Sequence, residues 1–70
     1  MNLYEGAVFE INKGPTYHWN DTKKRTDIVW ADDILVIIES GWYCKALRLY
    51  DCHIFHFTIN EMKTCRSINI

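Results

Sequence analysis

Glycine, proline and long apolar runs are all scarce in this chain. It has three glycines and one proline among 70 residues, and the glycines are too scattered to form a phosphate-binding loop. The longest apolar run is the five residues Ile34–Ile38, far short of the roughly 20 residues that cross a bilayer. The first residues lack the basic and apolar regions of a signal peptide. We therefore expect a cytoplasmic protein that does not enter a membrane.

Cysteine is present but in an odd number, as Cys44, Cys52 and Cys65. A small secreted domain more often has an even number at regular spacing, so we expect reduced thiols. Zinc sites favour closely spaced ligands, and the best pair is Cys52 and His56, four residues apart and therefore on one face of a strand. Buried thiols that pack as small apolar groups are the commoner alternative. We expect no metal site and no cofactor.

Residue patterns typical of catalysis are also missing. Asp32 and Asp33 are adjacent, so on an extended chain they point to opposite faces and look like turn residues. The histidines His18, His53 and His56 have no carboxylate or nucleophile at a sequence spacing that would indicate a catalytic pair. A substrate cleft is difficult to build in a chain of this length. We expect a protein that is not an enzyme.

The chain is rich in the residues that form β-strands. Its apolar content of 49% and aromatic content of 14% can fill the core of one domain spanning residues 1–70 and argue against disorder. β-branched and aromatic runs bounded by Gly, Asp, Asn and Ser predict short strands. The expected strands lie at residues 3–11, 27–30, 34–38, 42–50 and 53–59, and a last strand ends at residue 70.

Alternation along these strands predicts which side chains face the core. In the first strand the inward set is Ala7, Phe9 and Ile11. The run Ile34–Ile38 is apolar on both faces, as in a central strand that is covered on both sides. For the next two strands the phase is ambiguous. There we favour an inward set of Leu47, Leu49, Phe55, Phe57 and Ile59, which turns His56 outward.

The order of these elements resembles the SH3-like small β-barrels, a group that includes Tudor-like and KOW-like domains. The resemblance implies an all-β fold, a small antiparallel barrel of five to six strands with a long first loop. It also implies a 3₁₀ turn before the last strand, at Thr58–Met62. The segment Leu47–Asp51 is similar to the Ala-Leu-Tyr-Asp-Tyr signature of signalling SH3 domains, but it lies in the middle of the chain. Binding of proline-rich peptides is therefore not expected.

The expected long loop, residues 12–26, holds the best candidates for a binding site. Four basic residues and one acidic residue give residues 12–25 a charge of 4 − 1 = +3, so the rest of the chain, with a total of −1, carries −4. Aromatic rings beside cations suit either a protein interface or the stacking of bases beside phosphates. Alternatively, Trp19 folds back as a plug over the core. The candidate partner-binding residues are Tyr17, His18, Trp19, Lys23, Lys24 and Arg25.

These observations predict a small non-catalytic module that binds another macromolecule. We favour a protein partner, and binding of nucleic acid through residues 13–25 is the alternative. Solitary small barrels are frequent among phage accessory proteins, so we expect an inhibitor or modulator of a host or partner protein, in the host cytoplasm if the source is viral. Both a monomer and a homodimer are compatible with the sequence.

Overall fold

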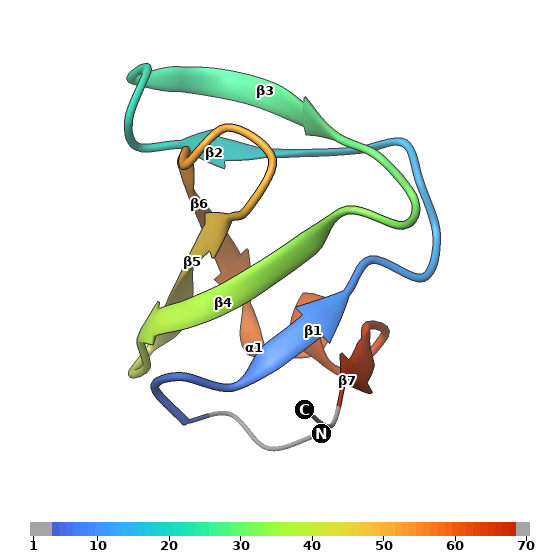
Figure 1. Cartoon of the computed structure of the whole chain (residues 1–70). Helices are drawn as coiled ribbons and strands as arrows, with labels where there is room; N and C mark the ends of the chain where they lie inside the picture. The colour runs from blue at the N-terminus through green and yellow to red at the C-terminus, as the bar shows by residue number, and fades with distance from the viewer. Residues whose placement is uncertain (1–3, 69–70) are drawn as a thin grey trace.

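A computed structural model describes residues 4–68 of the chain. Seven strands and one helical turn make up the described part (Figure 1). The strands are β1 (Val8–Glu10), β2 (Thr16–Asn20), β3 (Arg25–Val29), β4 (Ile34–Glu39), β5 (Tyr43–Arg48), β6 (Ile54–Thr58) and β7 (Arg66–Ile68). The helical turn, α1 (Ile59–Met62), lies between β6 and β7.

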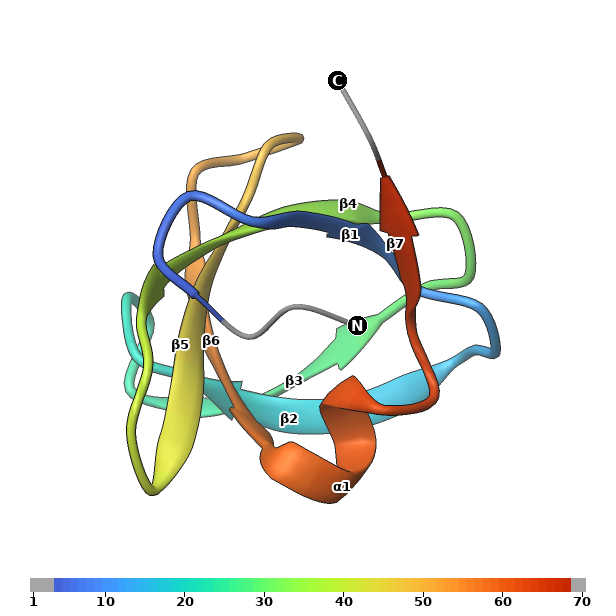
Figure 2. The same ribbon diagram turned by 90° about the horizontal axis from the view of Figure 1, so that it is seen from below.

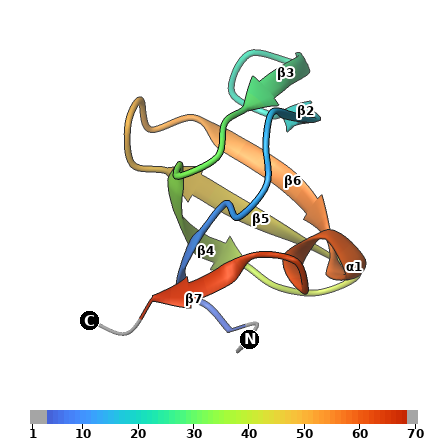
Figure 3. The ribbon, with the colours of Figure 1, turned by 90° about the vertical axis from the view of Figure 1, so that its right-hand side faces the viewer.

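All seven strands belong to one antiparallel sheet in the order β3-β2-β6-β5-β4-β1-β7. The sheet is strongly bent, so that β2 and β3 lie across from β1 and β4, with β5 and β6 at the fold between them (Figure 2). The β2–β3 hairpin and β7 end up at opposite ends of the molecule (Figure 3). The sheet does not close, because β3 and β7 remain its two edges.

The core lies inside the bend of this sheet. Phe9 of β1 and Phe57 of β6 meet edge to face, with their ring centroids 5.7 Å apart. Such an arrangement adds about 0.5–1.5 kcal/mol to the gain from burial alone. The core consists of Ala7, Phe9, Ile11, Val29, Leu35, Ile37, Cys44, Ala46, Phe55, Phe57 and Met62.

The all-β fold predicted from the strand pattern is confirmed for the described residues, although the strands number seven instead of five or six. The inward set Ala7, Phe9 and Ile11 is correct, and so are Phe55 and Phe57. Ile59 packs against the core from α1 and is only partly buried. Leu3 and Ile70 lie outside the described residues.

The prediction of a long first loop is wrong, because most of residues 12–26 form the β2–β3 hairpin. All five residues of β2 pair with β3, from Thr16 opposite Val29 to Asn20 opposite Arg25. The inward residues of β2 are His18 and Asn20, which are polar, so the alternation did not look like that of a strand. Their burial is compatible with polar side chains only because each finds partners inside the protein.

The favoured phase of residues 42–50 is also wrong. Cys44, Ala46 and Arg48 point inward, whereas Leu47 is half-buried and Leu49 is exposed. Arg48 takes an inward position because carboxylates on neighbouring segments compensate its charge. The strand at Ile34–Ile38 is likewise covered on one face only, since Ile34 and Ile38 are exposed.

The turn expected before the last strand is present, as a single turn of α-helix instead of 3₁₀ helix. A capping box begins this turn. The Glu61 amide donates to Oγ1 of Thr58 at 3.1 Å, and the Thr58 amide donates to Oε1 of Glu61 at 2.8 Å. Met62 anchors the turn in the core.

Candidate functional site

Two of the candidate binding residues, Tyr17 and Trp19, point outward from β2. The exposed fraction is 68% for Tyr17 and 41% for Trp19. Both are held on a strand that pairs with β3 over its whole length, so the rings project from a fixed backbone. Trp19 is therefore not a plug over the core. Rigid, exposed aromatic side chains lose little entropy when a partner covers them.

His18, between these two residues, points to the opposite side and is buried. Its Nε2 lies 2.8 Å from Oγ1 of Thr16, its Nδ1 lies 3.3 Å from Oε2 of Glu61, and its ring lies against Phe57. Burial lowers the pKa of His18, and the nearby Glu61 carboxylate partly opposes that effect. His18 thus links β2 to α1 and is not placed to contact a partner.

The three basic candidates lie at the exposed turn of the hairpin, but two of them are paired. Lys24 Nζ lies 3.0 Å from Oδ1 of Asp21, and Arg25 Nη2 lies 3.4 Å from Oδ2 of Asp27. The hydrogen bond from Lys24 is the main reason why the pKa of Asp21 is lowered. Asp21 is already included in the charge of +3 counted for residues 12–25, and Asp27 of β3 lowers the charge of the β2–β3 hairpin itself to 3 − 2 = +1.

Trp19 belongs to a larger aromatic surface on the outer side of the sheet. Oδ1 of Asp21 lies 3.4 Å from Nε1 of Trp19 and 3.8 Å from Nε2 of His56, on β6. The His56 ring in turn stacks on Tyr43 of β5, with centroids 4.8 Å apart. We call the exposed or half-exposed residues Tyr17, Trp19, His56 and Tyr43 the aromatic strip; it crosses β2, β6 and β5.

Tyr43 was missed by the sequence reasoning. It points outward because Cys44, the next residue, points inward, and that is the phase that was rejected. Trp42, which precedes it in the turn before β5, is almost fully exposed. The sequence signal for Tyr43 was the small, apolar pair Cys44 and Ala46, which fits a crowded core better than Lys45 and Leu47 do.

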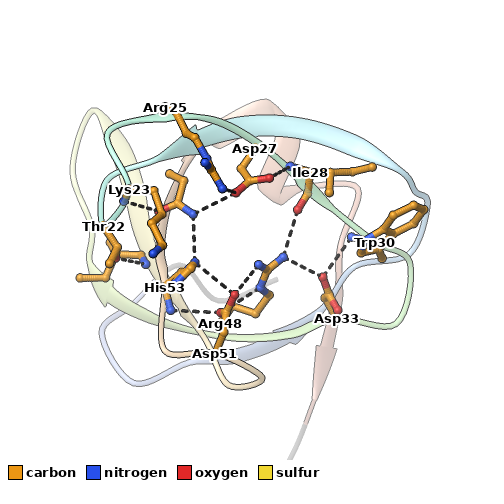
Figure 4. A network of polar contacts seen from close by, with 12 residues as sticks. Thr22, Lys23, Arg25, Asp27, Ile28, Trp30, Asp33, Arg48, Asp51 and His53 are labelled. Atoms are coloured by element: carbon orange, nitrogen blue, oxygen red, sulfur yellow. Dashed lines mark hydrogen bonds and ion pairs between the residues drawn. The ribbon is translucent and has the colours of Figure 1, made fainter.

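A second polar cluster lies where β3, β4 and β5 meet, and it centres on Arg48 (Figure 4). Arg48 Nε and Nη2 donate to the two oxygens of Asp51 at 3.1 and 2.6 Å. Its Nη1 donates to the Ile28 carbonyl at 3.0 Å and to Oδ2 of Asp33 at 3.3 Å. The guanidinium also lies 4.6 Å from the centroid of the Phe55 ring.

The Arg48 cluster connects two distant segments and occupies the edge of the sheet at Ile28. Arg48 ties the β5–β6 turn to edge strand β3, because Ile28 belongs to β3 and Asp51 to the turn. The hydrogen bonds from Arg48 lower the pKa of Asp51, and Asp51 is the main reason why the pKa of Arg48 is raised. The Ile28 amide donates to Oδ1 of Asp27, so both polar backbone groups of Ile28 are occupied. An occupied edge is less open to pairing with another strand.

Asn20 connects the hairpin to this cluster. Its amide nitrogen lies 3.1 Å from Nδ1 of His53 and 3.5 Å from Oδ2 of Asp27, and its side-chain oxygen accepts from the Lys23 amide at 3.0 Å. Nδ1 of His53 also lies 3.1 Å from Oδ2 of Asp51. The fully buried Asn20 therefore has partners on both its nitrogen and its oxygen, as buried amides require.

Two cavities open beside these groups. One, of about 70 Å³, lies next to His18, Glu61 and Cys65, and the other, of about 260 Å³, is lined by Trp30, Tyr50 and the Arg48 cluster. Sites that enclose a whole small molecule commonly measure about 300–1,000 Å³. Both cavities are smaller than this range. The hydroxyl, imidazole and carboxylate of Thr16, His18 and Glu61 lie beside the smaller cavity.

Cys52 and His56, the pair considered for zinc, do not share the face of one strand. Cys52 lies in the turn before β6 with a φ of 61°, so the strand geometry that would align it with His56 does not apply. No group of three or more His, Cys, Asp or Glu side chains suited to a metal occurs among residues 4–68. Cys44 is buried, Cys65 is half-buried, and Cys52 is exposed.

Comparison with protein-family models, curated proteins and solved structures finds no match to this chain. Within the described residues, no helix is long and apolar enough to cross a membrane. The candidate site is therefore defined by its own geometry, that is, by the aromatic strip and the partly compensated charges around it.

Proposed function

We propose that this protein is a non-catalytic module that binds another protein through the aromatic strip. The observation that carries the proposal is the continuity of Trp19, His56 and Tyr43 across three neighbouring strands. Tyr17 extends the strip along β2, and Trp42 lies beside Tyr43 in sequence and is exposed. Tyr and Trp are enriched among the residues that dominate binding energy at protein interfaces.

The charges around the strip favour a protein over a nucleic acid. The Asp21 carboxylate lies between Trp19 and His56 and pairs with Lys24, so this pair offers no net positive charge to the phosphate of a nucleotide whose base stacks on Trp19. Of the three basic candidates, Lys24 and Arg25 already pair with Asp21 and Asp27, so within the described residues only Lys23 has no carboxylate partner and could meet those phosphates. Nucleic-acid binding depends mainly on uncompensated cations. A protein partner needs no such excess of positive charge.

The proposal extends to the architecture and to the mode of action. The bent antiparallel sheet with a helical turn before β7 is compatible with a single SH3-like barrel that has an open seam, in which the hairpin takes the place of the long first loop. A chain of this size acts by covering or bridging the surface of its partner, as an inhibitor or modulator does. We place it in the cytoplasm as a monomer or a homodimer.

The test is a pull-down from cell lysate, with and without nuclease, using the wild-type chain, the double variant Trp19→Ala/Tyr43→Ala and the control Tyr4→Ala. Tyr4 is an exposed aromatic residue that lies before β1 and outside the strip. We expect a captured protein that resists nuclease, remains with Tyr4→Ala and is lost with the double variant. Capture that nuclease abolishes, or that the double variant retains, would contradict the proposal.

A further inference from the structure

The cavity beside Arg48 is lined by two exposed aromatic residues and by carboxylates. Its volume is about 260 Å³, and it lies between the end of β3, the start of β4 and the turn after β5. Trp30 and Tyr50, which contribute the two rings, are 54% and 88% exposed. The lining residues are Asp27, Ile28, Trp30, Asp33, Arg48 and Tyr50. None of them belongs to the aromatic strip.

Arg48 does not make this cavity a site for anions. All three nitrogens of its guanidinium already donate to Asp51, Asp33 or the Ile28 carbonyl. These four bonds use four of the five N–H groups of Arg48, so an anion could reach only the second N–H of Nη2 without breaking a charge-assisted bond. It would also approach the carboxylates that surround Arg48. The positive charge of Arg48 is therefore compensated by Asp33 and Asp51.

The carboxylates keep capacity for a further donor. Trp30 and Arg48 both donate to Oδ2 of Asp33, whereas no hydrogen bond from residues 4–68 reaches its Oδ1. Asp27, Asp33 and Asp51 carry three negative charges, against the two positive charges of Arg48 and Arg25, so the cluster has a net charge of −1. The Asp27 and Asp33 side chains are partly exposed and can be reached from the cavity.

We propose that this cavity binds the side chain of an arginine from a partner protein. The guanidinium of that arginine stacks on Trp30 and Tyr50 and donates to Asp33. Cations are attracted to aromatic faces, and arginine makes this contact more often than lysine does. Arginine also carries several planar N–H donors, which match a carboxylate better than the single ammonium of lysine. A quaternary ammonium has no N–H donor, so it would leave Oδ1 of Asp33 without a partner.

The site is independent of the aromatic strip, so either proposal can fail alone. The probe is N-acetyl-arginine-N-methylamide, titrated into ¹⁵N-labelled protein at constant ionic strength, with the indole N–H resonance of Trp30 as the readout. The corresponding citrulline derivative has nearly the same shape without the charge, and tetramethylammonium has the charge without the donors. For a single side chain we expect a dissociation constant on the order of 10 mM.

Two variants complete the test. Tyr50→Ala removes one ring from an exposed turn, and we expect it to weaken arginine binding by about 3- to 10-fold. Trp42→Ala removes another highly exposed ring from a different turn and leaves the affinity unchanged. The proposal is supported by a saturable shift of Trp30 with the arginine probe, little shift with citrulline, and the expected loss in Tyr50→Ala. A citrulline or tetramethylammonium response as strong as that of arginine, or full affinity in Tyr50→Ala, overturns it.

Discussion

Replacing Arg48 by methionine tests whether the polar cluster stabilises the fold. Arg48 is 8% exposed and holds Asp51, Asp33 and the Ile28 carbonyl together. The charge-assisted pair with Asp51 contributes about 1.5–3 kcal/mol, with a value near the lower end because Asp51 remains partly in contact with water. Loss of the donor to the Ile28 carbonyl adds about 1 kcal/mol. Methionine keeps most of the contact with Phe55, so the expected total loss in the free energy of unfolding is about 3 kcal/mol.

The assay is unfolding by heat and by urea, followed by circular dichroism at pH 7. For a domain of this size, a loss of about 3 kcal/mol lowers the melting temperature by about 12–24 °C. The matched control is Arg66→Met, because Arg66 is 62% exposed in its ion pair with Glu10 and is expected to cost at most about 1 kcal/mol. Equal melting temperatures for the two variants would refute the reasoning. The difference between wild type and Arg48→Met also narrows below about pH 4, because Asp51, whose pKa is lowered in the folded state, loses its stabilising charge as it becomes protonated.

Two further predictions concern His18 and the glycines. Because burial lowers the pKa of His18, protonation favours the unfolded chain, so stability falls as the pH drops below about 6.5. Glu61→Gln, which keeps the capping box, lowers this pKa further, and an NMR titration that places the pKa of His18 above 6.5 would contradict the assignment. A Cβ on Gly14 would lie 2.4 Å from the Ala31 nitrogen, so Gly14→Ala costs about 1–3 kcal/mol in urea unfolding. Gly41→Ala meets nothing within 4 Å and is expected to be neutral or slightly stabilising; similar losses in both variants would be inconsistent with the close approach at Gly14.

The sequence predicted the strands whose alternation is apolar and failed where inward positions are polar. Phe55 and Phe57 on β6 could be predicted as inward because each is followed by a more polar residue, His56 and Thr58. His18 on β2 and Arg48 on β5 are buried through partners distant in sequence, Glu61 and Asp33. The alternation of polar and apolar residues along a strand carries no information about contacts with distant segments. The inward side chains of β2 were therefore assigned to a loop, and those of β5 were assigned to the outer face of the sheet.

The candidate site, too, was predicted where the signal lies within one segment and missed where it depends on strand pairing. Tyr17 and Trp19 were singled out because they are large aromatic residues in a polar segment, and both are exposed. Their extension to His56 and Tyr43 depends on the pairing of β2 with β6 and of β6 with β5, which the sequence alone does not specify. The charge of the hairpin was overestimated, because Asp27 on β3 was not counted with Arg25.

The most direct test of the aromatic strip is the affinity of Trp19→Ala for the captured partner, measured beside its folded fraction. Trp19 is partly buried, so we expect the substitution to cost about 1–2 kcal/mol of stability, and affinity is compared at a temperature where both chains are folded. An anchor of this kind contributes about 2–4 kcal/mol, which corresponds to a loss of affinity of about 30- to 1,000-fold. The account predicts that loss for Trp19→Ala and unchanged affinity for Tyr4→Ala. Full affinity in folded Trp19→Ala would show that the strip is not the binding surface.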